Sequence, residues 1–408
     1  MKILIMAAGS RGDVAPYTGV GVRLRAAGHE VALATHQSFA PMVKESGLEF
    51  RVLPADPRTG PPTADGEKRG GGSLLRKASA FVRELGAGIA DAAGQGADLL
   101  LLSTTTAPLG WHVAEAMNVP GLGLYLQPVA PTAAFPPVVG GGRSLGRWGN
   151  RAAGRLSLRV VDRIHASAVK ELRARLDLPP AGPRAVRRRQ ESADWPVLHG
   201  FSPAVVPRPP DWRAGLEVVG NWWPHVPEDH ELSAELEDFL RAGPPPVFIG
   251  FGSMAGGEGE RLSDLAVRAL RRAGVRGVLQ AGWAGLAASG DDVMTVGEVP
   301  HASLFPRMAA VVHHAGAGTA AAGLRAGVPV VPVPVMADQP FWAGRLTALG
   351  AGTDPIPFRE LSVDRLAEEI RHAVGEPSYR DGAARAARRM GEEDGAGAVA
   401  EAVARFCA

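Results

Sequence analysis

The chain opens with an apolar run, a short polar turn and a second apolar run, which is the pattern of a βαβ unit. Residues 2–8 are apolar after the first position, as expected for a strand buried on both faces of a parallel sheet. The turn Gly9–Asp13 follows, then a helical pattern that ends at Gly28 and a strand over Glu30–Thr35. The same half carries further predicted elements: strands at Leu99–Ser103 and Gly121–Tyr125, a loop over Thr59–Ser73 and a helix over Leu156–Leu176.

A second alternation of strands and helices begins after the proline-rich stretch Pro203–Pro210. Its predicted strands are Pro246–Gly252, Val275–Gln280, Val293–Val296, Ala309–Val312 and Val328–Val333, and its predicted helices are Arg261–Ala273, Leu361–Val374 and Ala383–Arg405. The two series predict an α/β protein of two doubly wound, Rossmann-like domains that face each other across a cleft. We place the domains at residues 1–210 and 211–385, with a C-terminal helix at 386–408 that packs back toward the first domain.

Composition narrows the class of protein. A chain of 408 residues with 46% hydrophobic residues, 52 glycines and 34 prolines suits two loop-rich α/β cores. The formal net charge of +2 indicates no nucleic-acid partner. The single cysteine, Cys407, allows no internal disulfide or cysteine metal site. The first apolar run is too short for a signal peptide, and no stretch approaches the roughly 20 apolar residues of a transmembrane segment, so we expect a cytoplasmic monomer or homodimer.

The most informative motif is the turn His313–Thr319, which follows a buried strand and opens a short helix. Glycine N–H groups and the positive end of a helix form a seat for an anion, and a diphosphate fits it. His314 abuts the turn and is the better ligand, whereas His313 alternates to the other face of the strand and fills space. Beyond the next strand, Asp338 and Gln339 supply a carboxylate and an amide suited to sugar hydroxyls. Together these residues predict a nucleotide-sugar site.

Two interpretations of Asp13 remain open. Because Ala7 occupies the first glycine position, Gly9–Asp13 lacks the full dinucleotide fingerprint, and an NAD-dependent oxidoreductase is disfavoured. Asp13 then either caps the following helix or acts as a general base in the cleft. Ser253, after Gly252, is likewise either a helix cap or a residue that faces the same cleft.

Other polar and aromatic clusters have structural explanations. The basic run Arg184–Arg189 has no interleaved aromatic residues, which favours a solvated face over a nucleic-acid or membrane surface. Trp222 and Trp223 are typical of packing between domains, with an acceptor pocket as the second interpretation. The histidines do not have the spacing of a metal site, and the sequence contains no Asp-x-Asp pair. We therefore expect no metal and no cofactor.

The chain resembles the two-domain family 1 glycosyltransferases of the GT-B fold, especially bacterial natural-product enzymes of the glycopeptide and macrolide type and the sterol glucosyltransferases. The resemblance spans both halves and rests on ordered motifs: Gly9-Ser10-Arg11-Gly12-Asp13-Val14-x-Pro16, Gln127-Pro128, Pro131-Thr132, Phe135-Pro136, Gly250-Phe251-Gly252-Ser253-Met254, Val299-Pro300-His301, Leu304-Phe305-Pro306-Arg307, His313-His314-x-Gly316-Ala317-Gly318-Thr319 and Asp338-Gln339-Pro340-Phe341-Trp342.

This resemblance implies that the C-terminal half binds the donor and that Asp13 is the catalytic carboxylate. The implied donor contacts are Ser10, Ser253, His314, Gly316, Ala317, Gly318 and Thr319 at the phosphates, Val299 by the base, and Asp338 and Gln339 at the sugar. The chain departs from plant members at Glu298, where they stack a tryptophan, and at Ala322, where they use a glutamate. Ala315 replaces a frequent glycine, which we expect to be tolerated because glycines remain at 316 and 318.

The implied reaction is transfer of a hexose from a UDP- or dTDP-sugar to a hydroxyl group, with inversion at the anomeric carbon and without a metal. Apolar segments around residues 128–142 favour a hydrophobic acceptor such as a polyketide, macrolide or sterol-like lipid, contacted by Trp111, Gln127 and Phe135. Two alternatives are a non-catalytic helper of another glycosyltransferase and a nucleotide-sugar epimerase of the same fold.

Overall fold

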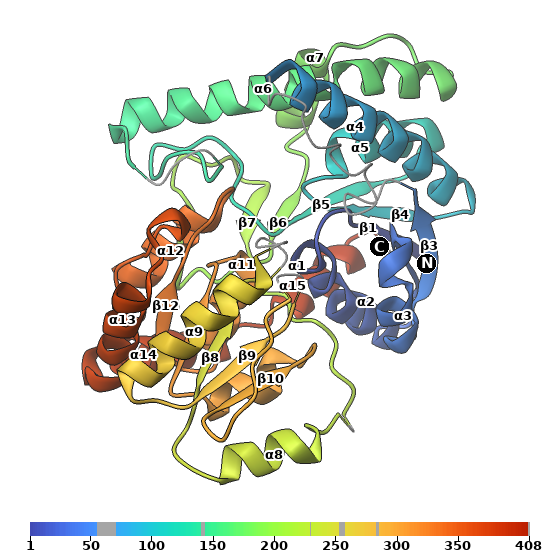
Figure 1. Ribbon diagram of the computed structural model, residues 1–408. Coiled ribbons are helices and arrows are strands. Elements are labelled where there is room, and N and C mark those ends of the chain that lie inside the picture. The colour runs from blue at the N-terminus through green and yellow to red at the C-terminus, as the bar shows by residue number, and fades with distance from the viewer. Residues whose placement is uncertain (55–70, 140–142, 229, 253–257, 283–284, 407–408) are drawn as a thin grey trace.

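A computed structural model describes residues 1–54, 71–139, 143–228, 230–252, 258–282 and 285–406 (Figure 1). Two parallel sheets, each with helices on both faces, make up the molecule, which confirms the predicted α/β fold of two doubly wound units. The first sheet has the order β3-β2-β1-β4-β5-β6-β7 and the second the order β10-β9-β8-β11-β12.

The first sheet is built on β1, whose side chains alternate between two cores. Ile3 and Ile5 join the core beneath α2 and α15, while Leu4 and Met6 join the core beneath α4, α5 and α6. The strands are β1 Lys2–Met6, β2 Glu30–His36, β3 Glu49–Leu53, β4 Leu99–Leu102, β5 Gly121–Tyr125, β6 Val197–His199 and β7 Leu216–Val218. The helices and 3-10 turns of this half are α1 Arg11–Val14, α2 Pro16–Ala26, η1 Gln37–Phe39, α3 Ala40–Glu45, α4 Gly71–Gly94, α5 Ala107–Met117, α6 Gly146–Arg175 and α7 Pro183–Ser192.

The second sheet is also buried on both faces. Ile249 and Val312 pack with α9 and α13 on one face, whereas Phe248 and Val311 pack with α11, α12 and α14 on the other. Its strands are β8 Val247–Gly250, β9 Gly277–Gln280, β10 Val293–Val296, β11 Ala310–His313 and β12 Val330–Pro332. The helices and 3-10 turns of this half are α8 Ala234–Arg241, α9 Gly259–Ala273, α10 His301–Leu304, η2 Phe305–Arg307, α11 Ala317–Arg325, α12 Gln339–Ala348, η3 Phe358–Glu360, α13 Val363–Gly375, α14 Pro377–Gly391 and α15 Gly395–Ala404.

Three sequence-based boundaries differ from the structure. Strand β7 lies after residue 210 yet pairs with β6 in the first sheet, so this sheet crosses the boundary that we drew there. The single helix predicted over 383–405 is two helices, because Asp394 caps the backbone N–H of Gly397 and starts α15 anew. The predicted loop 59–73 overlaps the start of α4 at Gly71, and its residues 59–70 lie outside the described residues.

The C-terminal helix lies against the first sheet's helices. Val399 and Val403 of α15 belong to the core that contains α2, and the Trp222 indole donates a hydrogen bond to the Gly395 carbonyl oxygen at 3.1 Å. The next tryptophan, Trp223, packs instead beneath the Arg325 guanidinium of α11, 4.4 Å from its ring centre. The adjacent tryptophans thus contact both halves of the molecule.

A buried polar cluster ties α5 to α6 and α7. The Arg173 guanidinium donates to Nδ1 of His112 at 2.9 Å and to the Glu115 carboxylate at 2.6 Å, and Arg189 of α7 also reaches Glu115 at 3.1 Å. Burial, assisted by the neighbouring arginine, lowers the pKa of His112 from 6.5 to about 4. Burial likewise lowers the pKa of His199, which is fully buried beside Trp212, to about 4. Both imidazoles are therefore neutral in the folded protein at neutral pH.

These two histidines predict a loss of stability in mild acid. Their unfolded forms bind protons below pH 6.5 while the folded forms stay neutral down to about 4, so the free energy of unfolding falls as the pH decreases through this window. At pH 5 each histidine should cost roughly 2 kcal/mol. Urea unfolding between pH 7 and 5 measures this loss. His112→Asn keeps an acceptor for Arg173 but cannot titrate, so its pH dependence should be shallower; an unchanged slope would contradict the assignment.

Candidate active site

The turn after β1 holds the Asp13 carboxylate. Asp13 Oδ2 accepts hydrogen bonds from the backbone N–H of Ser10 at 2.9 Å and from its hydroxyl at 2.8 Å. Gly9 has φ +143°, and a Cβ there would lie 2.7 Å from Asp13 Oδ2, so only glycine leaves room for the carboxylate. Asp13 thus caps its own turn, as the structural interpretation predicted, and this cap leaves the second carboxylate oxygen facing other groups.

Oδ1 of Asp13 faces the loop after β5. The Gln127 amide nitrogen lies 3.4 Å from this oxygen, and the Gln127 amide oxygen in turn accepts a hydrogen bond from the Thr104 hydroxyl at 3.2 Å. The structure therefore brings together Asp13 and Ser10 from one turn, Gln127 from a second and Thr104 from a third, all at the carboxyl edge of the first sheet. Ligands of open parallel sheets bind at this edge.

The turn after β11 places His314 between two glycines. A Cβ on Gly252 would lie 2.8 Å from the imidazole carbon Cε1, and a Cβ on Gly316 would lie 2.5 Å from Nε2. Burial lowers the pKa of His314 to about 4, so the ring is neutral at neutral pH and presents one N–H donor. Its Nδ1 is buried and has no hydrogen-bond partner among the described residues.

The neighbouring His313 shapes the turn rather than lining the cleft. It is fully buried on the other side of the strand, as the alternation predicted, and its Nδ1 accepts a hydrogen bond from the Ala315 backbone N–H at 2.9 Å. Ala315 itself has φ +59°, so the replacement of glycine falls on the left-handed residue of the turn. The glycines at 316 and 318 do not relieve this strain, which corrects the reason that we gave for tolerance of Ala315.

Helix α11 begins at Ala317 with Gly316 as its N-cap, so its first N–H groups have no partner within the helix, and α11 contacts α1 of the first domain. Gly318 is exposed and Thr319 half-buried at this end. The N-terminus of a helix carries a partial positive charge that favours anions. The turn and the helix N-terminus therefore have the geometry that an anion seat needs, and the binding of a diphosphate there stays a prediction.

Asp338 and Gln339 lie at the start of α12 beside the same cleft. The Trp342 indole donates to Asp338 Oδ2 at 2.9 Å. Burial raises the pKa of Asp338, the hydrogen bond from Trp342 opposes this rise, and the negative charge of Asp13 adds a smaller increase. The buried Gln339 uses its amide oxygen to accept hydrogen bonds from the N–H groups of Val335 and Met336 at 2.8 and 3.1 Å, which leaves its amide nitrogen as the available group.

The other predicted site residues lie in different parts of the molecule. Val299 is half-buried against the large second-domain core, and Ser253 lies outside the described residues. Phe135 is buried against Phe341 of α12, with ring centres 5.3 Å apart, so it joins the domains. Trp111 packs beneath Arg189, 4.9 Å from its ring centre, on the side of the buried polar cluster. Their roles toward an acceptor remain predictions.

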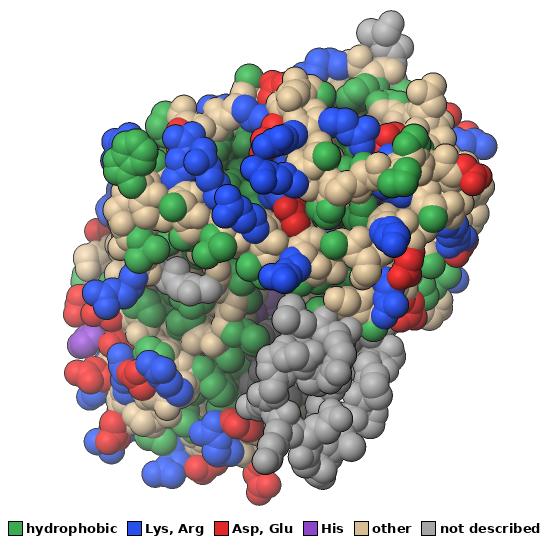
Figure 2. Space-filling model, turned by 90° about the horizontal axis from the view of Figure 1, so that it is seen from above, with side chains coloured by type: hydrophobic (Ala, Val, Ile, Leu, Met, Phe, Trp, Pro, Cys, Tyr) green, Lys and Arg blue, Asp and Glu red, His purple; other side chains and the backbone are tan. Residues whose placement is uncertain are grey.

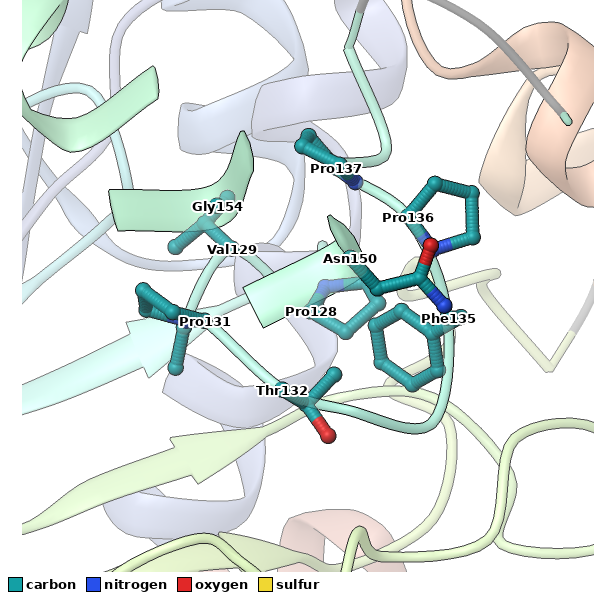
Figure 3. A pocket seen from close by; sticks show the side chains of 10 residues that line it. Pro128, Val129, Pro131, Thr132, Phe135, Pro136, Pro137, Asn150 and Gly154 are labelled. Carbon is teal, nitrogen blue, oxygen red and sulfur yellow. The ribbon is translucent and has the colours of Figure 1, made fainter. Parts of the chain in front are cut away.

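The apolar loop that follows Gln127 folds around a small pocket, and four prolines line it together with Val129, Ala130, Thr132, Phe135, Asn150 and Gly154 (Figure 3). Its volume of about 10 Å³ is the space of a single water. Asp211 fixes the loop by accepting hydrogen bonds from the Thr132 hydroxyl at 2.6 Å and the Ala133 N–H at 2.9 Å. An acceptor therefore does not fit inside this pocket, and contact of the loop with an acceptor stays a prediction.

Sequence reasoning missed three groups at the site. Nε2 of His36, at the end of β2, accepts a hydrogen bond from the Gly9 N–H at 3.0 Å. Arg11 forms an ion pair with Glu298 at 2.8 Å, which joins the two domains at the mouth of the cleft. A polar residue directly after a predicted strand was the available signal for His36; the ion pair depends on how the domains meet and left no signal in the sequence.

Comparison with known proteins places this geometry in a family. Residues 3–136 match the glycosyltransferase family 28 N-terminal domain, and residues 280–405 match the erythromycin biosynthesis protein CIII-like C-terminal domain. The chain is 37% identical to O-mycaminosyltylonolide 6-deoxyallosyltransferase of Streptomyces fradiae, over 96% of this chain and 93% of that protein. The chain belongs to the two-domain glycosyltransferases of the GT-B fold.

This glycosyltransferase is also 34% identical to sterol 3-beta-glucosyltransferase UGT80A2 of Arabidopsis thaliana over 98% of its length, but it spans only 64% of that protein. The crystal structure of glycosyltransferase VinC in complex with DTDP superposes with a TM-score of 0.68 at 21% identity, over 100% of this chain and 99% of that one, and shares the fold. Across the described ranges, no helix is both long and apolar enough to cross a membrane. The described residues also contain no group of three His, Cys, Asp or Glu side chains placed to hold a metal.

The packing of Gly9 against Asp13 generates a stability prediction. Gly9→Ala adds a Cβ at a left-handed φ and 2.7 Å from the carboxylate, so it should lower the free energy of unfolding by about 1–3 kcal/mol. Gly12→Ala is the matched control, because a Cβ there meets only the Ser10 hydroxyl at 3.7 Å. Thermal unfolding of both variants measures the difference. Equal melting temperatures of the two variants would show that the turn accepts the added Cβ without a loss of stability.

Proposed function

We propose that this protein transfers a hexose from a UDP- or dTDP-sugar to a hydroxyl of a hydrophobic small molecule, with inversion and without a metal. The observation that carries the proposal is the contact of α1, which holds Asp13 in the first domain, with α11 of the second, where Arg11 also pairs with Glu298. A donor bound at one side and an acceptor at the other would bring their reacting atoms between these groups.

The α11 N-terminus suits the diphosphate of the donor. Outward N–H groups, the imidazole of His314 and the Thr319 hydroxyl offer hydrogen bonds to phosphate oxygens without a cation. These donors are fixed in place before the reaction, so they stabilise the charge that develops on the leaving diphosphate. The complex of VinC with DTDP supports a dTDP-sugar as one donor of this chain.

Asp13 is placed to act as the general base. Ser10 fixes Oδ2 through two hydrogen bonds, while Oδ1 lies beside Gln127 at the cleft. In the proposed step the acceptor hydroxyl gives its proton to Asp13 as its oxygen forms a bond to the anomeric carbon. The bond between that carbon and the phosphate oxygen breaks, and its electron pair leaves with the diphosphate. Attack from the face opposite the leaving group inverts the anomeric configuration.

Asp338 and Gln339 then select the sugar. The half-buried Asp338 carboxylate accepts one hydrogen bond from Trp342, which leaves acceptor capacity for a sugar hydroxyl. Burial is the main cause that raises the pKa of Asp338, and the Asp13 charge acts in the same direction, so a bound hexose would lie between two carboxylates. The names of the macrolide-type and sterol-type relatives support a hydrophobic acceptor.

Replacing the proposed base separates binding from chemistry. Asp13→Asn retains an oxygen that accepts from Ser10, so we expect unchanged dTDP and UDP affinity with turnover reduced by about 10²–10⁴-fold. Release of nucleotide from UDP-glucose and dTDP-glucose, with water in place of an acceptor, provides the assay. Asp264→Asn, an exposed change on α9, is the control and should retain full turnover. Normal turnover in Asp13→Asn would remove this residue from the role, and no turnover in the unaltered protein would favour a helper.

The seat for the diphosphate has its own test. Gly316→Ala places a Cβ 2.5 Å from Nε2 of His314 and must displace the imidazole. The loss of its hydrogen bond should weaken the binding of dTDP and UDP by at least about tenfold. Gly344→Ala, an exposed position of α12 with open space around it, should bind both nucleotides normally. Isothermal titration calorimetry compares the variants, and equal affinities would place the diphosphate elsewhere.

A further inference from the structure

The first half of α6 carries an unusual share of the exposed apolar side chains. Six of the ten large hydrophobic side chains that are exposed in the described part of the chain lie within residues 139–161. Trp148 is 90% exposed, Leu145 62% and Leu156 59%. The second half of α6 behaves differently, because Val169 and Leu172 pack into the core with α4 and α5. The fold therefore needs only the second half of this helix as an apolar surface.

Arginines alternate with these apolar side chains on the same outward face. Residues 143–161 contain five arginines and no aspartate or glutamate. Arg147, Arg155 and Arg159 are exposed, and a spacing of four or eight residues keeps them near one side of the helix. Figure 2 looks onto this side of the molecule and shows Arg and Lys side chains gathered among hydrophobic ones. We call the exposed members of residues 143–163 the α6 surface.

The neighbouring elements do not neutralise the α6 surface. Asp162, a half-buried residue within this stretch, pairs with Arg187 of α7, and Asp211 lies 3.8 Å from Arg151 on the inner side. Helix α7 adds the exposed Arg184 and Arg188. The positive charge thus stands at the surface beside an indole and aliphatic side chains.

We propose that the α6 surface binds the interface of a lipid bilayer that contains anionic lipids. Helices that lie in this interface place Trp and Leu among the upper acyl chains, while long arginines reach the phosphates of the head groups. Anionic lipids add an attraction that grows with each arginine near the membrane. A two-fold contact with a second copy fits less well, because it would set arginines of one α6 against arginines of the other.

The position of the α6 surface relates membrane binding to the proposed reaction. Asn150 and Gly154, on the inner side of the same stretch of helix, line the pocket under the loop that follows Gln127 (Figure 3). A membrane held against α6 would therefore lie next to the first-domain side of the cleft. A hydrophobic acceptor dissolved in the bilayer could reach the site without crossing water. The binding itself does not depend on the proposed transfer reaction, so the two can fail separately.

Co-sedimentation of the full chain with vesicles tests the proposal. The unaltered protein should pellet with vesicles of equimolar phosphatidylcholine and phosphatidylglycerol, far less with phosphatidylcholine alone, and less at high salt. Arg155→Glu with Arg159→Glu, and separately Trp148→Ala with Leu156→Ala, should each reduce the partition coefficient by about tenfold or more. Arg371→Glu with Arg388→Glu makes the same charge change at exposed positions of α13 and α14 and should leave partitioning unchanged.

Three outcomes would overturn the proposal. The first is a failure of the unaltered protein to pellet with anionic vesicles. The second is an equal loss in the control variant, since net charge alone would then explain binding. The third is a dimer in light scattering that Trp148→Ala with Leu156→Ala breaks, because the surface would then contact a second copy. Nucleotide release from dTDP-glucose in the same variants should stay unchanged, which separates membrane binding from catalysis.

Discussion

The imidazole of His314 lies between two stretches of backbone, and this contact fixes the turn that precedes α11. The ring of His314 lies where side chains on Gly252 and Gly316 would otherwise stand, at 2.8 and 2.5 Å from their missing Cβ atoms. This fit joins the end of β8 to the start of α11. It also keeps the ring buried, and burial holds the pKa near 4. A neutral ring costs less to bury than a charged one, so the turn can keep this shape without a bound ion.

In the first domain, hydrogen bonds hold a carboxylate, that of Asp13, in a fixed position. The Asp13 carboxylate is held by the N–H and hydroxyl of Ser10, and the Gly9 N–H is held by His36. One carboxylate oxygen therefore stabilises the turn while the other stays available. The two interpretations of Asp13 from the sequence are compatible, because a carboxylate has two oxygens. A cap that fixes the carboxylate would also orient it for the proton transfer that we propose.

Local patterns predicted the parts of the structure that local forces determine. The strands of the two sheet centres are continuous apolar runs, so the βαβ order and the turns at Gly9–Asp13 and His313–Thr319 could be recognised. Strands β6 and β7, of three residues each, were missed because such short strands exist only through pairing with neighbours. Phe135 shows the same limit. Its packing on Phe341, from the distant half of the chain, left no signal in the local sequence, and its role toward an acceptor stays a prediction.

Helix α6 shows why the apolar pattern of a sequence can fail to predict a helix whose side chains are exposed. The prediction began this helix at Leu156, because the preceding turns lack an apolar stripe that would face a core. Regular arginines and isolated apolar side chains in those turns contribute little to folding, since they remain in water. A protein selected for stability alone gains nothing from a tryptophan that is 90% exposed. Such a residue is better explained by a contact outside the folded chain, and its arginine neighbours restrict that contact to an anionic surface.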